Sequence, residues 1–335
     1  MVTMRVTQME RFGGPDVLRA AELPDPVPGP GQAVVDVAWA DVLFLETQVR
    51  RGEGFFTPSL PYVPGGAVGG RISALGPDVA AAWRGRQVVA RTVPAAGAPT
   101  GGGYAERALT RIQAVSAVPQ GVDLAQATAL AHDGPTAVRL FDNAVGAGAL
   151  RPGAWVLVLA AAGGLGALLV QLAKVAGARV AAAARGARKL TLIREELGAD
   201  LAVDYTEPGW TERVRAAAGP RGVDLVLDGA GGTPGREAFG LTARGARFSA
   251  HGAPGGAFTG ITSQAAAARG VTLAGIEQVQ LSPEEAEPLL RRALSQVPAG
   301  ELTPVVGQTF PLADAAQAHA AIESREVLGK TLLQG

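Results

Sequence analysis

The chain has 335 residues, which is long for a single hydrophobic core and indicates two domains. Its 30 basic and 30 acidic side chains leave no net charge, so it lacks the electropositive surface of a nucleic-acid-binding protein. Cysteine is absent, which excludes disulfide bonds and every zinc site that needs thiolate ligands.

Two segments bear on location. The N-terminal sequence MVTMRVTQMERFGG has charged residues and no apolar core, which argues against a signal peptide. Residues 152–173 carry no charge and are long enough to span a bilayer, but their centre is Ala-Gly-Gly-Leu-Gly. A strand followed by an amphipathic helix fits them better. We therefore predict a soluble, cytoplasmic protein that does not bind a membrane.

Residues 1 to about 120 have the pattern of a small β-barrel or sandwich. The segments GQAVVDVAWA, GRISALG and GRQVVARTV are short Val/Ile-containing runs bounded by glycine or proline. From Asp123, a candidate N-cap, the spacing of apolar residues approaches 3.6 and predicts a helix.

Units of strand and helix follow. The predicted strands AWVLVLAA, ARVAAAAR, ADLAVDY and VDLVLDGAG alternate with helical segments, and ARGARFSAHGAP adds a fifth strand with its exit loop. Such alternation favours right-handed βαβ crossovers in a doubly wound parallel sheet. We predict an α/β protein in which a Rossmann-type domain, residues 123–265, is inserted between the two parts of a β-rich catalytic domain, residues 1–122 and 266–335.

The first strand-to-helix turn contains Ala160, Gly163 and Gly166 in an A-x-x-G-x-x-G pattern. In a chain so rich in alanine and glycine, about one match is expected by chance. The context favours function over Ala/Gly-rich packing, because a strand precedes the turn and a helix follows it. Glycines there let the backbone approach a pyrophosphate, whose charge lies at a helix N-terminus. The turn predicts a dinucleotide site.

The end of the second strand indicates which dinucleotide binds. An NAD site usually places Asp or Glu there, to accept hydrogen bonds from the ribose hydroxyls. This chain has Arg185, Arg188 and Lys189 instead. Cations suit a 2′-phosphate, so we predict NADPH as the cofactor. A solvated basic turn is the alternative.

Taken in order, several segments resemble the zinc-independent quinone oxidoreductase branch of the medium-chain dehydrogenase/reductase family. They are PGPGQAVVDV, PYVPGGAVGGRISALGPDV, GGGYAER, LAAAGGLGALLVQLAKVAGARV, LGADLAVDY, VDLVLDGAGG and AHAAIESREVLGKTLL. The resemblance implies a GroES-like catalytic domain, an inserted Rossmann domain and reduction of quinones or activated enones with NADPH. It also implies an oligomer, and we expect a homodimer.

The resemblance assigns cofactor contacts to several elements. It implies that the pyrophosphate is contacted by Gly163, Gly164, Leu165 and Gly166, and the adenine-side phosphate by Lys189, Tyr205 and Arg325. It also implies that the nicotinamide is contacted by Thr136, and the nicotinamide ribose by the loop SAHGAPGG with His251 and Gly252.

Three of these residues have structural alternatives. Tyr205 fits equally a capping aromatic packed under the third strand. Arg325 is also placed to pair with an acid such as Glu323, and Thr136 to satisfy backbone donors at a helix N-terminus.

No metal is expected. Zinc-dependent relatives carry Gly-His-Glu where this chain has Gly65, Gly66 and Ala67. The three histidines, His132, His251 and His319, are on separate predicted elements without ligand spacing.

The substrate region departs from its relatives. The segment VAWADVLFLETQVRRG has Ala38 in place of the family's asparagine and Leu43 in place of its tyrosine. Aromatic residues surround these positions and favour flat hydrophobic substrates, although several of them also fit the barrel core. The predicted pocket residues are Trp39, Leu43, Phe44, Phe55 and Tyr62, with Phe56 beside them.

His132 and Asp133 are the candidate proton donor, because a neighbouring carboxylate keeps a histidine protonated. A purely structural role is the alternative.

The sequence leaves three functions open. The favoured one is an NADPH-dependent reductase of quinones or α,β-unsaturated carbonyls, since hydride transfer needs orientation and water exclusion more than it needs side-chain chemistry. The others are a specialised biosynthetic reductase of one large polycyclic substrate and a non-catalytic NADPH-binding or sensing protein.

Overall fold

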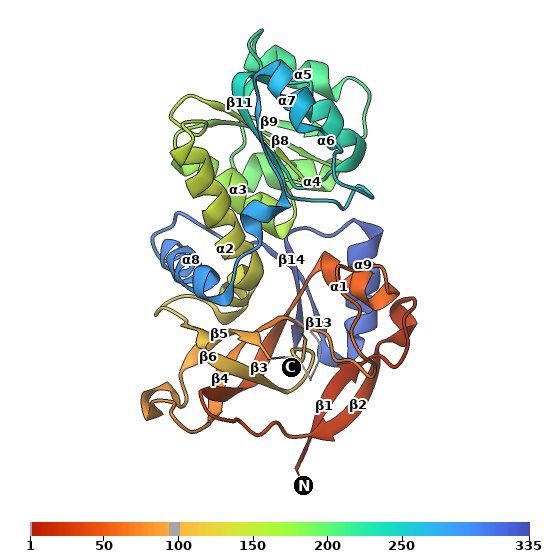
Figure 1. Cartoon of the computed structure of the whole chain (residues 1–335), viewed down its shortest axis with the longest axis vertical. Coiled ribbons are helices and arrows are strands. Elements are labelled where there is room, and N and C mark those ends of the chain that lie inside the picture. Colours follow the sequence, from red (N-terminus) through yellow and green to blue (C-terminus); the bar gives the residue numbers. More distant parts are fainter. Residues whose placement is uncertain (1, 94–100) are drawn as a thin grey trace. The chain divides into compact units, whose positions relative to one another are not determined.

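The computed structural model describes residues 2–93 and 101–335, and the chain divides into two compact units (Figure 1). The barrel unit comprises Met1–Pro135, Pro283–Pro298 and Pro304–Gly335. The parallel-sheet unit comprises Thr136–Ser282 and Ala299–Thr303.

The barrel unit is built on a six-stranded sheet whose strand order is β13-β14-β3-β4-β5-β6, and β3 also pairs with β6. This second pairing joins distant strands of the sheet and leaves fewer unpaired backbone groups at its edges. The strands are β3 (Gln32–Val42), β4 (Ala67–Leu75), β5 (Gln87–Thr92), β6 (Arg107–Ala117), β13 (Val306–Pro311) and β14 (Lys330–Gln334).

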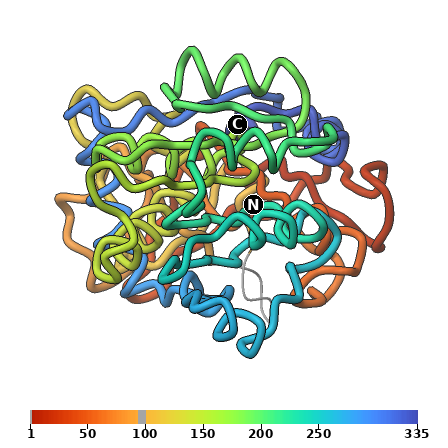
Figure 2. Tube along the Cα trace, turned by 90° about the horizontal axis from the view of Figure 1, so that it is seen from above, coloured from red at the N-terminus to blue at the C-terminus, as the bar shows by residue number. Residues whose placement is uncertain are grey.

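Both ends of the chain contribute to the barrel unit. Strand β14 pairs antiparallel with β3, and α9 (Ala315–Ser324) packs on α1 (Phe44–Arg51). Figure 2 shows the dark blue C-terminal trace returning beside red N-terminal segments. The remaining elements are the hairpin β1 (Thr3–Gln8) and β2 (Arg19–Pro24), α8 (Pro283–Gln296), and the 3₁₀ turns Pro15–Val17, Ala81–Trp83 and Leu312–Asp314.

The parallel-sheet unit has the strand order β12-β11-β10-β7-β8-β9, with every pairing parallel. Numbered from β7, this is the order 3-2-1-4-5-6 of a dinucleotide-binding Rossmann sheet. The strands are β7 (Trp155–Leu159), β8 (Arg179–Ala184), β9 (Leu201–Asp204), β10 (Val223–Asp228), β11 (Thr242–Ala250) and β12 (Thr272–Ala274).

The connections between these strands are helical. They are α3 (Gly164–Val175), α4 (Ala187–Thr191) continued by a π-helical turn over Leu192–Glu196, α5 (Trp210–Ala218), α6 (Gly232–Phe239) and α7 (Ser263–Arg269), and a 3₁₀ turn (Ile276–Val279) follows β12. The strands are rich in Val, Leu and Ala because layers cover both faces of a parallel sheet. Leu157, Val226 and Phe248 are fully buried in its core.

Helix α2 (Leu124–Gly146) contributes residues to both units. Its start is the predicted one: Oδ1 of Asp123 accepts hydrogen bonds from the backbone N–H groups of Ala125 (2.9 Å) and Gln126 (3.1 Å). Pro135 lies inside the helix and has no N–H with which to bond the carbonyl four residues earlier.

Two boundaries differ from the expected ones. The first unit continues to Pro135 rather than ending at residue 122, because the first turns of α2 pack with the barrel. The second unit continues to Ser282 rather than ending at residue 265, because Thr272–Ala274 form a sixth parallel strand beside β11. A three-residue strand is too short to show a periodicity in sequence. Helix α1 was also not anticipated.

Among the described residues, no helix is both long enough and apolar enough to cross a membrane.

Phe248 offers a test of the parallel-sheet core. Phe248→Ala removes a fully buried ring and is expected to lower the free energy of unfolding by about 3–5 kcal/mol. Phe55→Ala is the matched control, because 68% of that side chain is exposed, and it should cost less than about 1 kcal/mol. Urea unfolding followed by circular dichroism compares them, and equal losses would contradict this account of the core.

Candidate active site

The glycine turn of the parallel-sheet unit leads from β7 into α3. Ala160 follows β7 with φ 56°, a left-handed conformation, and its carbonyl accepts a hydrogen bond from Gly163 N (3.0 Å). Gly163 is the N-cap of α3 and has no side chain to satisfy the first-turn N–H groups. Such groups are free to bind an anion.

Gly166 sets how closely α3 approaches β7. A Cβ at this position would lie 2.3 Å from the carbonyl oxygen of Ala160 and 2.8 Å from Cα of Ala161. The helix therefore contacts the strand end through bare backbone, which is the packing role of the last glycine in a dinucleotide-binding turn.

The end of β8 presents cations. Arg185 directly follows β8 and is exposed. Arg188 and Lys189 are on the short helix α4, where Arg188 is exposed and Lys189 is half-buried. In the described part of the chain, neither guanidinium group has a carboxylate within ion-pair distance. The guanidinium groups of Arg185 and Arg188 are available to a phosphate.

Asp204, at the end of β9, is the nearest acid, and the sequence analysis did not single it out. It accepts hydrogen bonds from Gly186 N (2.6 Å), Thr206 N (2.8 Å) and Thr206 Oγ1 (2.6 Å). Burial alone would raise the pKa of Asp204, but these hydrogen bonds and Arg185 lower it. Through the hydrogen bond from Gly186 N, the carboxylate of Asp204 stabilises the basic turn.

Tyr205 directly follows Asp204 and is half-buried, packed against the sheet core, in the same unit as Lys189. Arg325 belongs to the barrel unit, where it ends α9 and its guanidinium carbon lies 5.7 Å from the centroid of the Phe44 ring. Glu323 forms ion pairs with Arg50 and Arg51.

The loop after β11 is held close to the end of β10. His251 N (3.1 Å) and Gly252 N (3.0 Å) both donate to the carbonyl of Asp228. A Cβ on Gly252 would lie 2.2 Å from the carbonyl oxygen of Gly229, so this loop requires glycine.

His251 carries an unused buried polar atom. Its Nδ1 lies 3.1 Å from Ser249 Oγ, whereas its buried Nε2 has no hydrogen-bond partner among the described residues. Burial lowers the pKa of His251 to about 4, so the ring is neutral. A buried polar atom without a partner indicates a ligand group at that position. With the glycine turn and the basic turn, it gives the unit the features a dinucleotide needs.

The barrel unit contains a buried charge cluster that joins three elements. Asp41 of β3 is fully buried; its Oδ2 lies 2.8 Å from Nδ1 of His132 on α2, and its Oδ1 lies 2.7 Å from Nζ of Lys330 on β14. Lys330 Nζ also lies 3.3 Å from Asp133 Oδ2.

The predicted partnership of His132 with Asp133 is corrected by this geometry. Adjacent residues on a helix point in different directions, so Asp133 turns to Lys330 and the carboxylate beside His132 is that of Asp41. Burial lowers the pKa of His132 despite Asp41, so the ring is neutral near pH 7 rather than protonated.

The other members of the charge cluster respond to burial in different ways. Burial would raise the pKa of Asp41, but Lys330 and His132 outweigh it and hold that pKa low. Burial dominates at Asp133 and raises its pKa. Burial would lower the pKa of Lys330, but Asp133 and Asp41 raise it. The cluster therefore holds an ionised Asp41–Lys330 pair.

A second buried network surrounds Glu46 on α1. Its carboxylate accepts hydrogen bonds from Leu43 N (2.9 Å), Gly65 N (3.0 Å), Gly66 N (3.2 Å) and Tyr104 OH (2.8 Å). Glu46 thereby connects the start of α1 to the Gly65–Gly66 turn. The pattern of a glutamate three residues after a helix start was available in the sequence but was not used.

His319 completes this network. Its Nε2 lies 2.9 Å from Tyr104 OH, and burial lowers its pKa to about 3. Across the described residues, no group of three or more His, Cys, Asp or Glu side chains is placed to hold a metal ion.

The predicted aromatic residues divide between surface and core. Phe55 is exposed and packs edge-on against Phe56, with ring centroids 4.9 Å apart. Tyr62 is 5% exposed and belongs to the barrel core, where its backbone pairs with Met9. Its side chain therefore packs in the core and does not form the predicted pocket surface. Trp39, Leu43 and Phe44 are partly exposed.

Thr136 lies within α2, which begins at Leu124. The alternative reading of Thr136 as a helix N-terminal hydroxyl is therefore wrong.

The comparisons with known proteins agree with this architecture. Residues 29–120 match the model of the alcohol dehydrogenase GroES-like domain, and residues 197–333 match that of the zinc-binding dehydrogenase domain. The chain is 29% identical to a quinone oxidoreductase of Rattus norvegicus over 332 residues, which cover 98% of this chain and 97% of the relative.

Solved structures extend the likeness. A mycobacterial protein complexed with NADPH is 31% identical with a TM-score of 0.88, over 99% of this chain and 100% of that one. The quinone oxidoreductase of Escherichia coli, also complexed with NADPH, is 25% identical with a TM-score of 0.88 over the whole of both chains.

A GroES-like barrel unit and a Rossmann sheet define a medium-chain dehydrogenase/reductase. The chain belongs to the quinone oxidoreductase branch of this family and is an oxidoreductase.

Gly166 and Gly163 give a matched test of the turn. Gly166→Ala forces a methyl group against the Ala160 carbonyl and should lower the free energy of unfolding by about 1–3 kcal/mol. A Cβ at Gly163 would lie 3.4 Å from the carbonyl oxygen of Ala160, and φ is −82°, so Gly163→Ala should cost about 1 kcal/mol or less. Denaturant unfolding measures both, and a larger loss at Gly163 would refute the close-packing role of Gly166.

Glu46 makes the stability of the protein depend on pH. Burial raises the pKa of Glu46 from 4.5 to about 7, so the folded state binds this proton more tightly than the unfolded state. The free energy of unfolding should therefore be highest below pH 4.5 and fall as the pH rises to 7, by up to about 3 kcal/mol from this group.

Glu46→Gln should remove that part of the pH dependence. The difference in unfolding free energy between wild type and variant, measured from pH 5 to pH 8, tests it. Glu10→Gln, at an exposed position, should follow the wild-type profile. A constant difference between wild type and Glu46→Gln across the range would show that Glu46 does not titrate there.

Proposed function

We propose that the protein is an NADPH-dependent reductase that transfers hydride to a quinone or an α,β-unsaturated carbonyl without zinc. The observation that carries the proposal is the glycine turn at Gly163–Gly166 together with Arg185 and Arg188, two exposed guanidinium groups that have no carboxylate of the described residues within ion-pair distance. The NADPH complexes of two similar proteins support the same cofactor.

Each part of the cofactor would meet a suitable group. The first turn of α3 would hold the pyrophosphate through backbone N–H groups. Arg185, Arg188 and Lys189 would hold the 2′-phosphate, with Tyr205 and Arg325 as further contacts. The unpartnered Nε2 of His251 suits a ribose hydroxyl, and Thr136 would contact the nicotinamide.

Bound NADPH would supply the hydride. A quinone that gains a hydride at oxygen or an enone that gains one at carbon becomes an oxyanion, which a proton then neutralises. We assign the proton-donor region to the His132–Asp133 segment. Asp41 holds the neutral His132 ring in place, and Lys330 keeps positive charge beside it.

Reduction of a quinone does not require a dedicated proton donor in the site, because a quinol oxyanion is stable enough to take its proton from water. The loss of two polar side chains, at Ala38 and Leu43, is compatible with this substrate class. Exposed aromatic surface at Phe55 and partly exposed surface at Trp39 and Phe44 favour a flat, apolar acceptor.

The relatives that support the substrate class are named quinone oxidoreductases in Rattus norvegicus and Pseudomonas aeruginosa, the second 26% identical over 97% of this chain. We further propose a homodimer located in the cytoplasm.

The double variant Arg185→Glu/Lys189→Glu tests cofactor and reaction together. The wild type should oxidise NADPH in the presence of 1,4-naphthoquinone, and the variant should lose at least about tenfold in kcat/KM for NADPH because acidic groups repel the 2′-phosphate. Activity with NADH should change little. Absorbance at 340 nm measures both rates.

Arg215→Glu on α5, also an exposed position, is the matched control and should behave as the wild type. A wild-type preference for NADH would overturn the assignment of the basic turn. Tight NADPH binding without turnover of any acceptor would favour a sensor or an enzyme specialised for one large substrate.

A further inference from the structure

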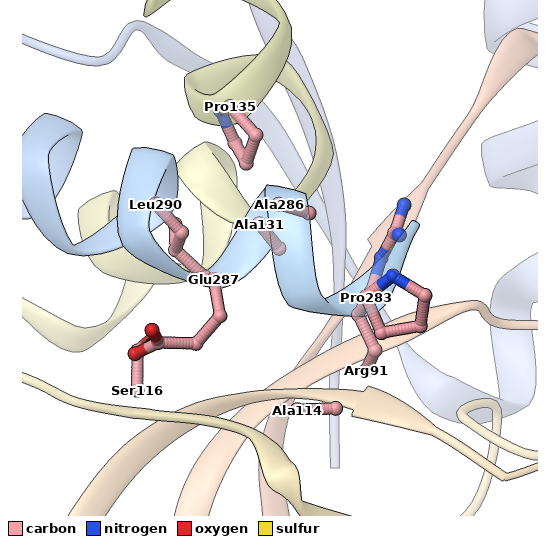
Figure 3. Close-up of a pocket in the computed structure, with 9 residues that line it drawn as sticks. All are labelled: Arg91, Ala114, Ser116, Ala131, Pro135, Pro283, Ala286, Glu287 and Leu290. Carbon is pink, nitrogen blue, oxygen red and sulfur yellow. Dashed lines mark hydrogen bonds between the residues drawn. The ribbon is translucent and has the colours of Figure 1, made fainter. Parts of the chain in front are cut away.

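A pocket of the barrel unit contains a cation that no acid neutralises by contact. It lies among β5, β6, α2 and α8, is partly open to solvent and has an enclosed volume of about 10 Å³, which is room for about one water molecule. Figure 3 shows the residues that line it: Arg91, Ala114, Ser116, Ala131, Pro135, Pro283, Ala286, Glu287 and Leu290.

The cation is Arg91 of β5. Its side chain is partly buried and runs from the strand past Pro283 at the start of α8 (Figure 3). Within the described ranges, 2–93 and 101–335, its guanidinium group forms no hydrogen bond and no ion pair. Burial lowers the pKa of Arg91, but an arginine stays charged at neutral pH.

The single carboxylate in the lining is already engaged. Glu287 accepts a hydrogen bond from Ser116 Oγ (3.3 Å) and another from Arg291 Nε (3.2 Å), with which it forms an ion pair. It therefore does not serve Arg91, whose N–H donors remain for another partner.

A partly desolvated guanidinium group without a partner is unfavourable, and an oxyanion with two oxygen atoms to offer relieves it through two parallel hydrogen bonds. The enclosed space is too small for a quinone ring, so only oxygen atoms of such a group would reach the guanidinium there. Lysine would not match this geometry equally, because its ammonium is a point charge.

The pocket adjoins the charge cluster of the barrel unit. Ala131 and Pro135 flank His132 and Asp133 on α2, and Arg91 acts electrostatically on both His132 and Asp41. An anion bound at Arg91 would therefore lie beside the region to which we assign the proton donor.

We propose that Arg91 is a specificity residue that binds an acidic group, a carboxylate or a sulfonate, carried by the quinone or enone substrate. The inference rests on the proposed function and narrows it to acidic acceptors. The competing role for Arg91 is that of a distant counter-charge to Asp41, which would affect stability and not substrate choice.

Paired acceptors separate these roles. We would measure KM and kcat for 1,4-naphthoquinone and for 1,4-naphthoquinone-2-sulfonate with the wild type, Arg91→Gln, Arg91→Lys and the control Arg111→Gln, an exposed residue of β6. Arg91→Gln should raise KM for the sulfonate at least about tenfold and leave KM for the neutral quinone unchanged. Arg91→Lys should restore part of the loss, and Arg111→Gln should have no effect.

Two results would overturn the proposal: equal changes in KM for both acceptors, or no change for either. If the wild type reduces no acceptor, the proposed function fails instead, and calorimetric binding of the sulfonate to wild type and Arg91→Gln still tests the site. Binding that is equal in the two proteins then refutes it, whereas binding lost in the variant supports an anion site apart from this reaction.

Discussion

The barrel unit depends on one buried ion pair. Asp41 is fully buried and Lys330 is 6% exposed, and they come from β3 and β14, strands that lie near opposite ends of the chain. Each would be strongly unfavourable alone, and removing one partner of such a pair typically costs about 3–5 kcal/mol. The pair therefore favours the return of the C-terminal strand to its place beside β3. The same carboxylate also holds His132. Asp41 therefore contributes both to the pairing of β14 with β3 and to the candidate proton-donor region.

Burial, more than the nature of the side chains, sets the charge states around the candidate sites. Glu46 and Asp228 are buried carboxyl groups with pKa values raised to about 7 and about 6, and backbone N–H groups bind both. His251 and His319 are kept neutral by the same loss of water. These groups hold loops at fixed positions: Glu46 holds the Gly65–Gly66 turn, and Asp228 holds the loop after β10. Hydride transfer requires a protein to position the reacting groups in this way.

The resemblance leads us to expect departures from the family at the substrate side, and the structure shows what some of the residues there contact. The resemblance implies that Ala38 and Leu43 stand where relatives have hydrogen-bonding side chains and that Gly65 and Gly66 stand where zinc-dependent relatives have a metal-ligand motif. In this structure the N–H groups of Gly65 and Gly66 donate to Glu46. Arg91 lies in a separate pocket of the barrel unit, where the lining acid Glu287 is engaged by Ser116 and Arg291. Such exchanges change which acceptor binds more than they change the reaction, since a fold of this kind supports many substrates.

The sequence by itself determined the local features of this protein. Alternation of short apolar strands and helices predicted the parallel sheet, Asp123 predicted the start of α2, and Gly163 and Gly166 predicted the tight turn, because each depends on a few consecutive residues. The cations after β8 were predicted from the sequence in the same way. The tertiary structure alone decided which residues meet over long sequence separations.

No local pattern pairs Asp41 with Lys330 or aligns Glu46 with Gly65. None predicts that the guanidinium group of Arg91 has no ion-pair partner among the described residues. Sequence proximity even misled for His132 and Asp133, since helix geometry turns neighbours apart. The short strand β12 was also invisible, because only pairing with β11 makes three residues a strand. Contacts of this kind, and the pKa values that burial imposes on them, exist only once the whole chain has packed.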